Sequence, residues 1–180
     1  EIQQFGPSQP HRFWPGLTIL SCWTDAHASL SAAALARRFP GVTLQPKGLI
    51  ATEAFVTLPL NGMHPVAVGS HYFEFIDETG AIQSVASLQL DHKYEVVVTT
   101  GGGLWRYRLG DRVQVTGFVG RTPSLIFIGR AGHVSDLFGE KLTGEFVTGV
   151  ITELSHHSLS PVRFAMLAPD SEPTSGVYTL

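Results

Sequence analysis

Asp111 carries a carboxylate where it could bind the hydroxyl groups of a sugar. Residues 94–99 are β-branched and aromatic enough to predict a strand, and the three glycines at 101–103 predict a turn. A second candidate strand, residues 105–109, ends at a predicted Gly110-Asp111 corner. A carboxylate at such a corner can accept two hydrogen bonds from a cis-diol. The same order is ordinary in a β-hairpin, so this stretch alone leaves both interpretations open.

Thr52 and Glu53 supply a second set of oxygen donors, directly after the apolar residues 49–51. A hydroxyl and a carboxylate suit Mg²⁺ beside a polyanion, because both are hard ligands. By itself, a Thr-Glu pair is more often a solvated loop than a metal site. The pair becomes informative only together with other motifs.

Three motifs together resemble the adenylate-forming enzymes, and most closely the auxin-responsive Gretchen-Hagen family of acyl-acid amido synthetases with its bacterial members. The motifs are Gly-Leu-Ile-Ala-Thr-Glu at 48–53, Tyr-Arg-Leu-Gly-Asp at 107–111 and Phe-Ile-Gly-Arg at 127–130. The resemblance runs from Trp14 to about Lys141. Two positions depart from the family pattern: Leu49 replaces an aromatic residue, and Gly132 stands where many relatives have a charged hinge residue.

The resemblance implies an ATP site made by Ala51, Thr52, Glu53, Asp111 and Arg130. Thr52 would contact the α-phosphate and Glu53 would help to hold Mg²⁺. Asp111 would bind the ribose hydroxyls, and Arg108 would anchor the turn or meet a carboxylate on the phosphate side. Metal binding in this chain is expected at Glu53 alone.

A hinge between a large and a small domain is implied at Gly129, Arg130 and Gly132, since hinge residues must absorb large backbone rotations. The implied reaction joins a small carboxylic acid to an amino acid through an acyl-adenylate, with ATP and Mg²⁺ as cofactors. An acyl-CoA ligase of the same superfamily and a non-catalytic β-rich interaction module remain alternatives. The family's phosphate loop and catalytic lysine would lie outside this chain. We therefore expect no catalytic residue here, and an inactive piece that needs the N-terminal part of its own polypeptide.

Composition excludes several classes of partner. A net charge of -3 and a pI near 6.2 argue against nucleic acid, and no apolar run approaches the ~20 residues of a membrane span. The single Cys22 excludes an internal disulfide framework, and a cytoplasmic location is expected. Only 15% of residues are charged, so part of the surface is expected to face further protein, as in a piece of a longer polypeptide.

The residue pattern predicts a mixed α/β fold. A strand at 17–23, a helix capped by Thr24-Asp25 at 26–39 and a strand at 42–45 form the opening unit. A twisted antiparallel sheet or distorted barrel should follow, with strands at 54–60, 66–68, 71–76, 85–88, 94–99, 105–109 and 112–118. A further strand at 124–128 should be followed by a helix at 140–156. Strands at 161–167 and 177–180 then end the chain. Residues 1–128 are expected to belong to the large domain, and residues 129–180 to the hinge and the start of the small one.

Overall fold

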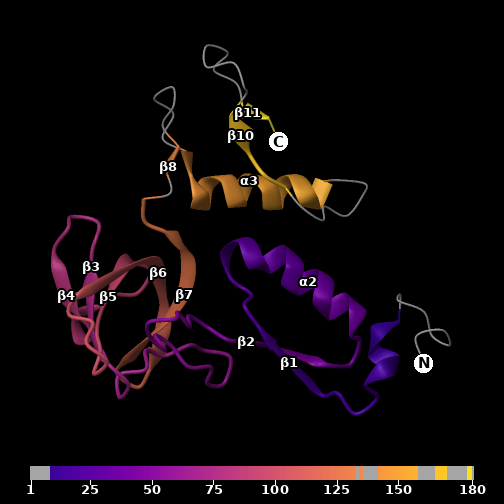
Figure 1. Ribbon diagram of the computed structural model, residues 1–180, viewed down its shortest axis with the longest axis horizontal. Coiled ribbons are helices and arrows are strands. Elements are labelled where there is room, and N and C mark those ends of the chain that lie inside the picture. Colours follow the sequence, from indigo (N-terminus) through magenta and orange to yellow (C-terminus); the bar gives the residue numbers. More distant parts are fainter. Residues whose placement is uncertain (1–8, 133, 136–141, 158–164, 170–177, 180) are drawn as a thin grey trace. The chain divides into compact units, whose positions relative to one another are not determined.

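The computed structural model (Figure 1) describes residues 9–132, 134–135, 142–157, 165–169 and 178–179. The chain divides into two compact units, Glu1–Ile128 and Gly129–Leu180. The assignment of these units to a large and a small domain stays a prediction.

A strand–helix–strand unit opens the first unit, after a short 3₁₀ helix, η1 (Pro10–Phe13). Strand β1 (Ile19–Cys22) pairs in parallel with β2 (Thr43–Pro46). Between them, the 3₁₀ helix η2 (Ala26–Ala28) leads into α2 (Ser29–Arg38). The α-helix stops before Phe39, because the proline that follows disfavours helical backbone at that residue. The predicted strand–helix–strand order is confirmed.

A five-stranded sheet with the order β4-β3-β5-β6-β7 makes up the rest of this unit (Figure 1). β3 pairs antiparallel with both β4 and β5, and β5 pairs antiparallel with β6. A two-residue turn, Gly120-Arg121, joins β6 to its neighbour β7. The predicted antiparallel sheet is confirmed, and its strands are β3 (Tyr72–Ile76), β4 (Ile82–Ser84), β5 (Lys93–Thr99), β6 (Tyr107–Val119) and β7 (Thr122–Arg130).

The core of the first unit lies between this sheet and the chain that precedes it. Alternate residues of the strands are buried, as their period of two requires. Side chains from residues 49–66 complete the same buried cluster. Its members include Leu49, Ala54, Val56, Val66, Phe73, Phe75, Val96, Val98, Leu109, Val113, Val115 and Leu125.

Three predictions for the strands of this unit were wrong. Residues 85–88 contain a 3₁₀ helix, η3 (Val85–Ser87), instead of a strand. Residues 105–109 and 112–118 are not two strands, because β6 runs through the predicted corner. Residues 54–60 and 66–68 form isolated bridges, Thr57↔Val66 among them, in place of regular strands.

The second unit contains one described helix, α3 (Gly144–His157), and short paired strands. β8 (Val134–Ser135) pairs with β9 (Leu142–Thr143), and β10 (Ala168–Pro169) with β11 (Tyr178–Thr179). The hydroxyl of Thr143 accepts a bond from the backbone N–H of Phe146 and caps the start of α3. Residues 140–141 and 161–164 of the predicted elements lie outside the described residues, and residues 165–167 are not a strand. Within the described chain, neither α2 nor α3 has the length and apolar character needed to cross a membrane.

Candidate functional site

Thr52 and Glu53 lie at the tip of a short hairpin. The backbone N–H of Ala51 donates to the carbonyl oxygen of Ala54 at 3.0 Å, which closes the turn around them. Thr52 and Glu53 are exposed, whereas Ala51 packs against the buried core. The hydroxyl and the carboxylate are therefore accessible to a ligand, on a backbone that the core holds in place.

The base of this hairpin is built from buried polar contacts. The backbone N–H of Leu49 donates to the hydroxyl of Thr57 at 2.8 Å, and the backbone N–H of His64 donates to the hydroxyl of Ser124 at 2.9 Å. Gly48 has a left-handed φ of +71°, and a Cβ there would overlap the Thr57 hydroxyl and lie 2.9 Å from Cδ2 of His64. The motif's glycine is thus required both by its backbone conformation and by a lack of space.

Asp111 lies inside strand β6, so the predicted Gly110-Asp111 corner was wrong. Gly110 does adopt a left-handed φ of +74°, but the strand continues through it to Val119. Asp111 is only 9% exposed and lies on the same face of the strand as the buried Leu109 and Val113. Asp111 is therefore held in a strand, which fixes its direction more firmly than a loop would.

A β-bulge surrounds Asp111. Val97 pairs with Arg108 and Glu95 pairs with Arg112, so residues 109–111 of β6 lie opposite the single residue Val96. An extra length of chain in one strand bends that strand and changes the direction of its side chains. The left-handed backbone of Gly110 thus forms part of a bulge within the strand, and not of a turn that ends it.

The hairpin tip and the bulged strand are anchored in one core. Leu49 and Ala54 flank the Ala51–Glu53 tip, and Leu109 precedes Asp111 by two positions; all three belong to the same buried cluster. The structure thus places four of the five predicted nucleotide-binding residues on one connected support.

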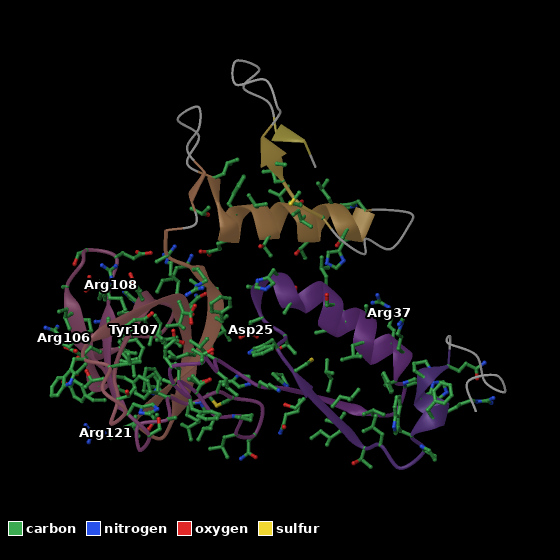
Figure 2. All side chains as sticks on the ribbon, in the orientation of Figure 1. Asp25, Arg37, Arg106, Tyr107, Arg108 and Arg121 are labelled. Atoms are coloured by element: carbon green, nitrogen blue, oxygen red, sulfur yellow. The ribbon has the colours of Figure 1, made fainter. Side chains whose placement is uncertain are left out.

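Two ion pairs lie on the other face of the sheet. Arg108 makes a two-pronged contact with Glu95, with Nε 2.8 Å from Oε1 and Nη2 2.6 Å from Oε2. Arg106 makes a single contact with Glu74, with Nε 2.9 Å from Oε2. The hydrogen bond and the charge of Glu95 raise the pKa of Arg108. Figure 2 labels both arginines, together with Tyr107.

Asp25 was predicted only as a helix cap. It does occupy the N-cap position of η2, but its side chain makes no capping bond there. Its Oδ2 instead accepts a hydrogen bond at 3.1 Å from the backbone N–H of Phe127, and Figure 2 shows Asp25 beside β7. No local pattern could have indicated this contact, because its partners are 102 positions apart.

The predicted hinge residues lie at and after the end of β7. Gly129 has a φ of +147° and Gly132 a φ of +85°, and neither has another atom within 4 Å of its would-be Cβ. Arg130, the last residue of β7, is exposed. Two glycines with positive φ in open surroundings are what a permissive link requires, and hinge motion at this link stays a prediction.

The donor set at the hairpin tip fits Mg²⁺ only with help from a ligand. Among the described residues, no group of three or more His, Cys, Asp or Glu side chains comes together. Mg²⁺ commonly uses one or two carboxylates and completes its shell with phosphate oxygens and water. Glu53 could hold the ion in that way, together with a bound nucleotide.

Comparisons with known proteins agree with the motifs. Residues 64–130 match the GH3 family central domain. A probable indole-3-acetic acid-amido synthetase GH3.1 of Oryza sativa subsp. japonica is 32% identical over 127 residues, covering 68% of this chain and 19% of that protein. A jasmonoyl–L-amino acid synthetase, JAR6 of Nicotiana attenuata, is 36% identical over 112 residues, covering 57% and 18%.

A solved structure, AtGH3.15 acyl acid amido synthetase in complex with 2,4-DB, has a TM-score of 0.74 and 25% identity. The match covers 81% of this chain and 27% of that one. The chain thus spans about a fifth to a quarter of the length of its relatives. Motifs, family model, relatives and fold agree, and the chain belongs to the GH3 family, the Gretchen-Hagen family that its three motifs resemble.

Proposed function

We propose that this chain is part of an ATP-dependent acyl-acid amido synthetase. The whole enzyme activates a small carboxylic acid as an acyl-adenylate with release of pyrophosphate, and the amine of an amino acid then displaces AMP. Relatives named indole-3-acetic acid-amido synthetase and jasmonoyl–L-amino acid synthetase support this pair of substrates. The free Cys22 fits a reducing compartment, so we also propose a cytoplasmic location.

One observation carries the proposal: an exposed Thr52-Glu53 tip and a strand-held Asp111 share a single core support. ATP carries a ribose diol and a chain of phosphates. The Asp111 carboxylate can accept hydrogen bonds from the diol, and the oxygens of Thr52 and Glu53 suit the phosphates and their Mg²⁺ ion. Ala51 holds the tip and Thr52 contacts the α-phosphate. Asp111 accepts hydrogen bonds from the ribose hydroxyls.

Charge on the phosphates is the main obstacle to attack by a carboxylate. Glu53 would hold a Mg²⁺ ion from the hairpin tip, and the ion would supply positive charge beside the phosphates. Arg130 would add a further positive charge from the end of β7. A catalytic lysine protonates or orients the reacting atoms in this proposal. It would lie outside this chain, whose matches cover only 19% and 25% of two relatives.

Two domains are proposed to meet at Gly129, Arg130 and Gly132. Residues 1–128 belong to the large domain and residues 129–180 begin the small one. The division of the chain into units at Ile128 supports this assignment, together with the positive φ angles of both glycines. Rotation of the small domain at this link would switch the enzyme from activation of the acid to formation of the amide.

The test is Asp111→Ala in the whole protein, assayed by acid-dependent exchange of pyrophosphate into ATP. Loss of charge-assisted hydrogen bonds should cost about 1.5–3 kcal/mol and raise the apparent KM for ATP roughly 10- to 100-fold. Gln114→Ala is the matched control, because Gln114 lies on the same strand and its side-chain amide donates to the carbonyl oxygen of Asp91. An unchanged KM in Asp111→Ala would contradict the ribose assignment.

The acceptor needs its own assay, because amide and thioester synthesis share the first half-reaction. With a carboxylic acid and ATP present, AMP release should be accelerated by amino acids and not by coenzyme A. Acceleration by coenzyme A alone would make the enzyme an acyl-CoA ligase. No pyrophosphate exchange with any acid would favour a non-catalytic module.

A further inference from the structure

The bulge around Asp111 is a weak point in the ladder between β5 and β6. Three residues of β6, 109–111, lie opposite Val96 alone, so regular pairing is interrupted there. Gly110 adds conformational freedom to the same three residues. Regular backbone pairing is therefore interrupted in the segment of β6 that carries Asp111, although the strand continues through it.

The ion pair between Glu95 and Arg108 spans this interruption. Arg108 is the last β6 residue paired before the bulge, opposite Val97. Glu95 is the β5 residue paired after it, opposite Arg112. The two-pronged contact at 2.6 and 2.8 Å thus connects the two ends of the interrupted ladder diagonally.

The geometry of this contact suits a brace. A guanidinium and a carboxylate joined by two parallel bonds fix their relative orientation as well as their distance. The Glu95 side chain is only 12% exposed, although that of Arg108 is 64% exposed. Water therefore competes mainly for the arginine, and the glutamate provides a fixed anchor.

We propose that Glu95 is a positioning residue for nucleotide binding, which holds the bulge through Arg108 and so sets the direction of Asp111. This inference rests on the proposed function, because it assumes that Asp111 binds the ribose. Glu95 lies on the sheet face opposite the core side chains and acts on the ligand only through the bulge.

The neighbouring pair, Glu74 with Arg106, is a matched control. It also lies on this sheet face, where it links β3 to the residue before β6, and its glutamate is 14% exposed, close to the 12% of Glu95. It makes one contact where the other makes two, and Arg106 precedes the start of β6, so this pair does not span residues 109–111. Removing either carboxylate removes one ion pair of this sheet face, but only Glu95→Gln releases the bulge.

The experiment compares Glu95→Gln, Glu74→Gln and the parent in the whole protein, by pyrophosphate exchange and by thermal unfolding. Glu95→Gln should raise the apparent KM for ATP about tenfold, equivalent to about 1.4 kcal/mol, with kcat within about twofold. Glu74→Gln should leave both constants within about twofold. Exchanging the partners in Glu95→Arg with Arg108→Glu should restore most of the lost affinity, while each single reversal should not.

Equal changes in KM for Glu95→Gln and Glu74→Gln would overturn the proposal, as would a loss confined to kcat or to the melting temperature. Failure of the proposed function is recognised separately through Asp111→Ala. If that variant binds ATP normally while Glu95→Gln does not, Glu95 acts by another route and the positioning role is excluded. If Asp111→Ala alone impairs binding, the site stands and only the brace is refuted.

Discussion

The carboxylate of Asp25 accepts a hydrogen bond at 3.1 Å from the backbone N–H of Phe127. Asp25 follows the parallel strand β1, and Phe127 lies in β7 of the antiparallel sheet, so one bond joins the two parts of the first unit. Phe127 is also the second-last residue of that unit. The contact therefore fixes the chain shortly before the proposed hinge begins.

Asp25→Ala should destabilise the protein by about 1–3 kcal/mol, because the Phe127 N–H would lose its charged acceptor in a half-buried place. Asp25→Asn keeps an acceptor oxygen of the same shape and should lose clearly less. Denaturant unfolding of both variants measures the difference. Equal and small losses would mean that water replaces the carboxylate without cost.

Gly48→Ala should be more harmful than an ordinary substitution at a left-handed glycine. Its Cβ would collide with the Thr57 hydroxyl as well as strain the backbone, so we expect a loss above about 2 kcal/mol. Gly62 is the control: its φ is +78°, but a Cβ there would meet no atom within 4 Å. Gly62→Ala should cost only the backbone strain, about 1–2 kcal/mol. Equal unfolding midpoints for Gly48→Ala and Gly62→Ala would show that the Thr57 side chain moves aside at little energetic cost.

Asp77 should make its turn between β3 and β4 sensitive to acid. The hydrogen bond from the Thr79 side chain, followed by that from Gln83, lowers the pKa of Asp77 from 3.8 to about 2. A carboxyl with a lowered pKa stabilises the fold fully above pH 3.8, and that contribution is lost as the pH falls towards 2. The stability difference between the parent and Asp77→Ala should therefore shrink between about pH 4 and pH 2. Denaturant unfolding of both proteins across this pH range measures the difference, and a difference that stays constant would contradict the prediction.

Glu53→Gln should weaken the dependence of adenylation on Mg²⁺, since the amide keeps the shape but loses the charge. We expect the concentration of Mg²⁺ giving half-maximal pyrophosphate exchange to rise several-fold, with little change in stability because Glu53 is exposed. Glu78→Gln is a suitable control, because Glu78 is also exposed and only 3.8 Å from Arg112 in its own ion pair. If the Mg²⁺ titrations of Glu53→Gln and the parent overlap, Glu53 does not bind the ion.

Local pattern was sufficient for much of this fold. The strand β5 was predicted within one residue of its observed start, because Val96, Val97 and Val98 favour a strand and Gly101 ends it. The helix α2 was predicted because Pro40 and Gly41 end its pattern. These features depend on neighbours in the sequence, so the sequence alone reveals them.

The rest depends on partners distant in the sequence. Gly110 has the same left-handed backbone in a turn and in a bulge, and only its pairing with β5 decides between them. Asp25 matches a helix cap locally, yet Phe127 takes its carboxylate. The brace from Glu95 to Arg108 likewise needs the register of two strands, which spacing does not supply. The motifs thus indicated the candidate site residues, and the tertiary contacts determined how they are held.

Gly132 provides the sharpest test of the proposed hinge. Its φ of +85° is a conformation that side-chain-bearing residues disfavour by about 1–2 kcal/mol. A Cβ there would meet no atom within 4 Å, so Gly132→Ala changes backbone preference without a clash. If the hinge alternates between two backbone states, the variant should disfavour the state with positive φ and slow one half-reaction more than the other.

Gly120→Ala supplies the matched comparison, because Gly120 has a φ of +60° in the open turn between β6 and β7. Its substitution carries a similar strain at a place with no proposed motion. Pyrophosphate exchange reports adenylation, and formation of the amide from a preformed acyl-adenylate reports the second step. We expect Gly132→Ala to change the ratio of the two rates by about three- to tenfold and Gly120→Ala to leave it unchanged, since 1.4 kcal/mol corresponds to a factor of ten. An equal effect on both steps, or on neither, would show that Gly132 serves the chain only as a turn.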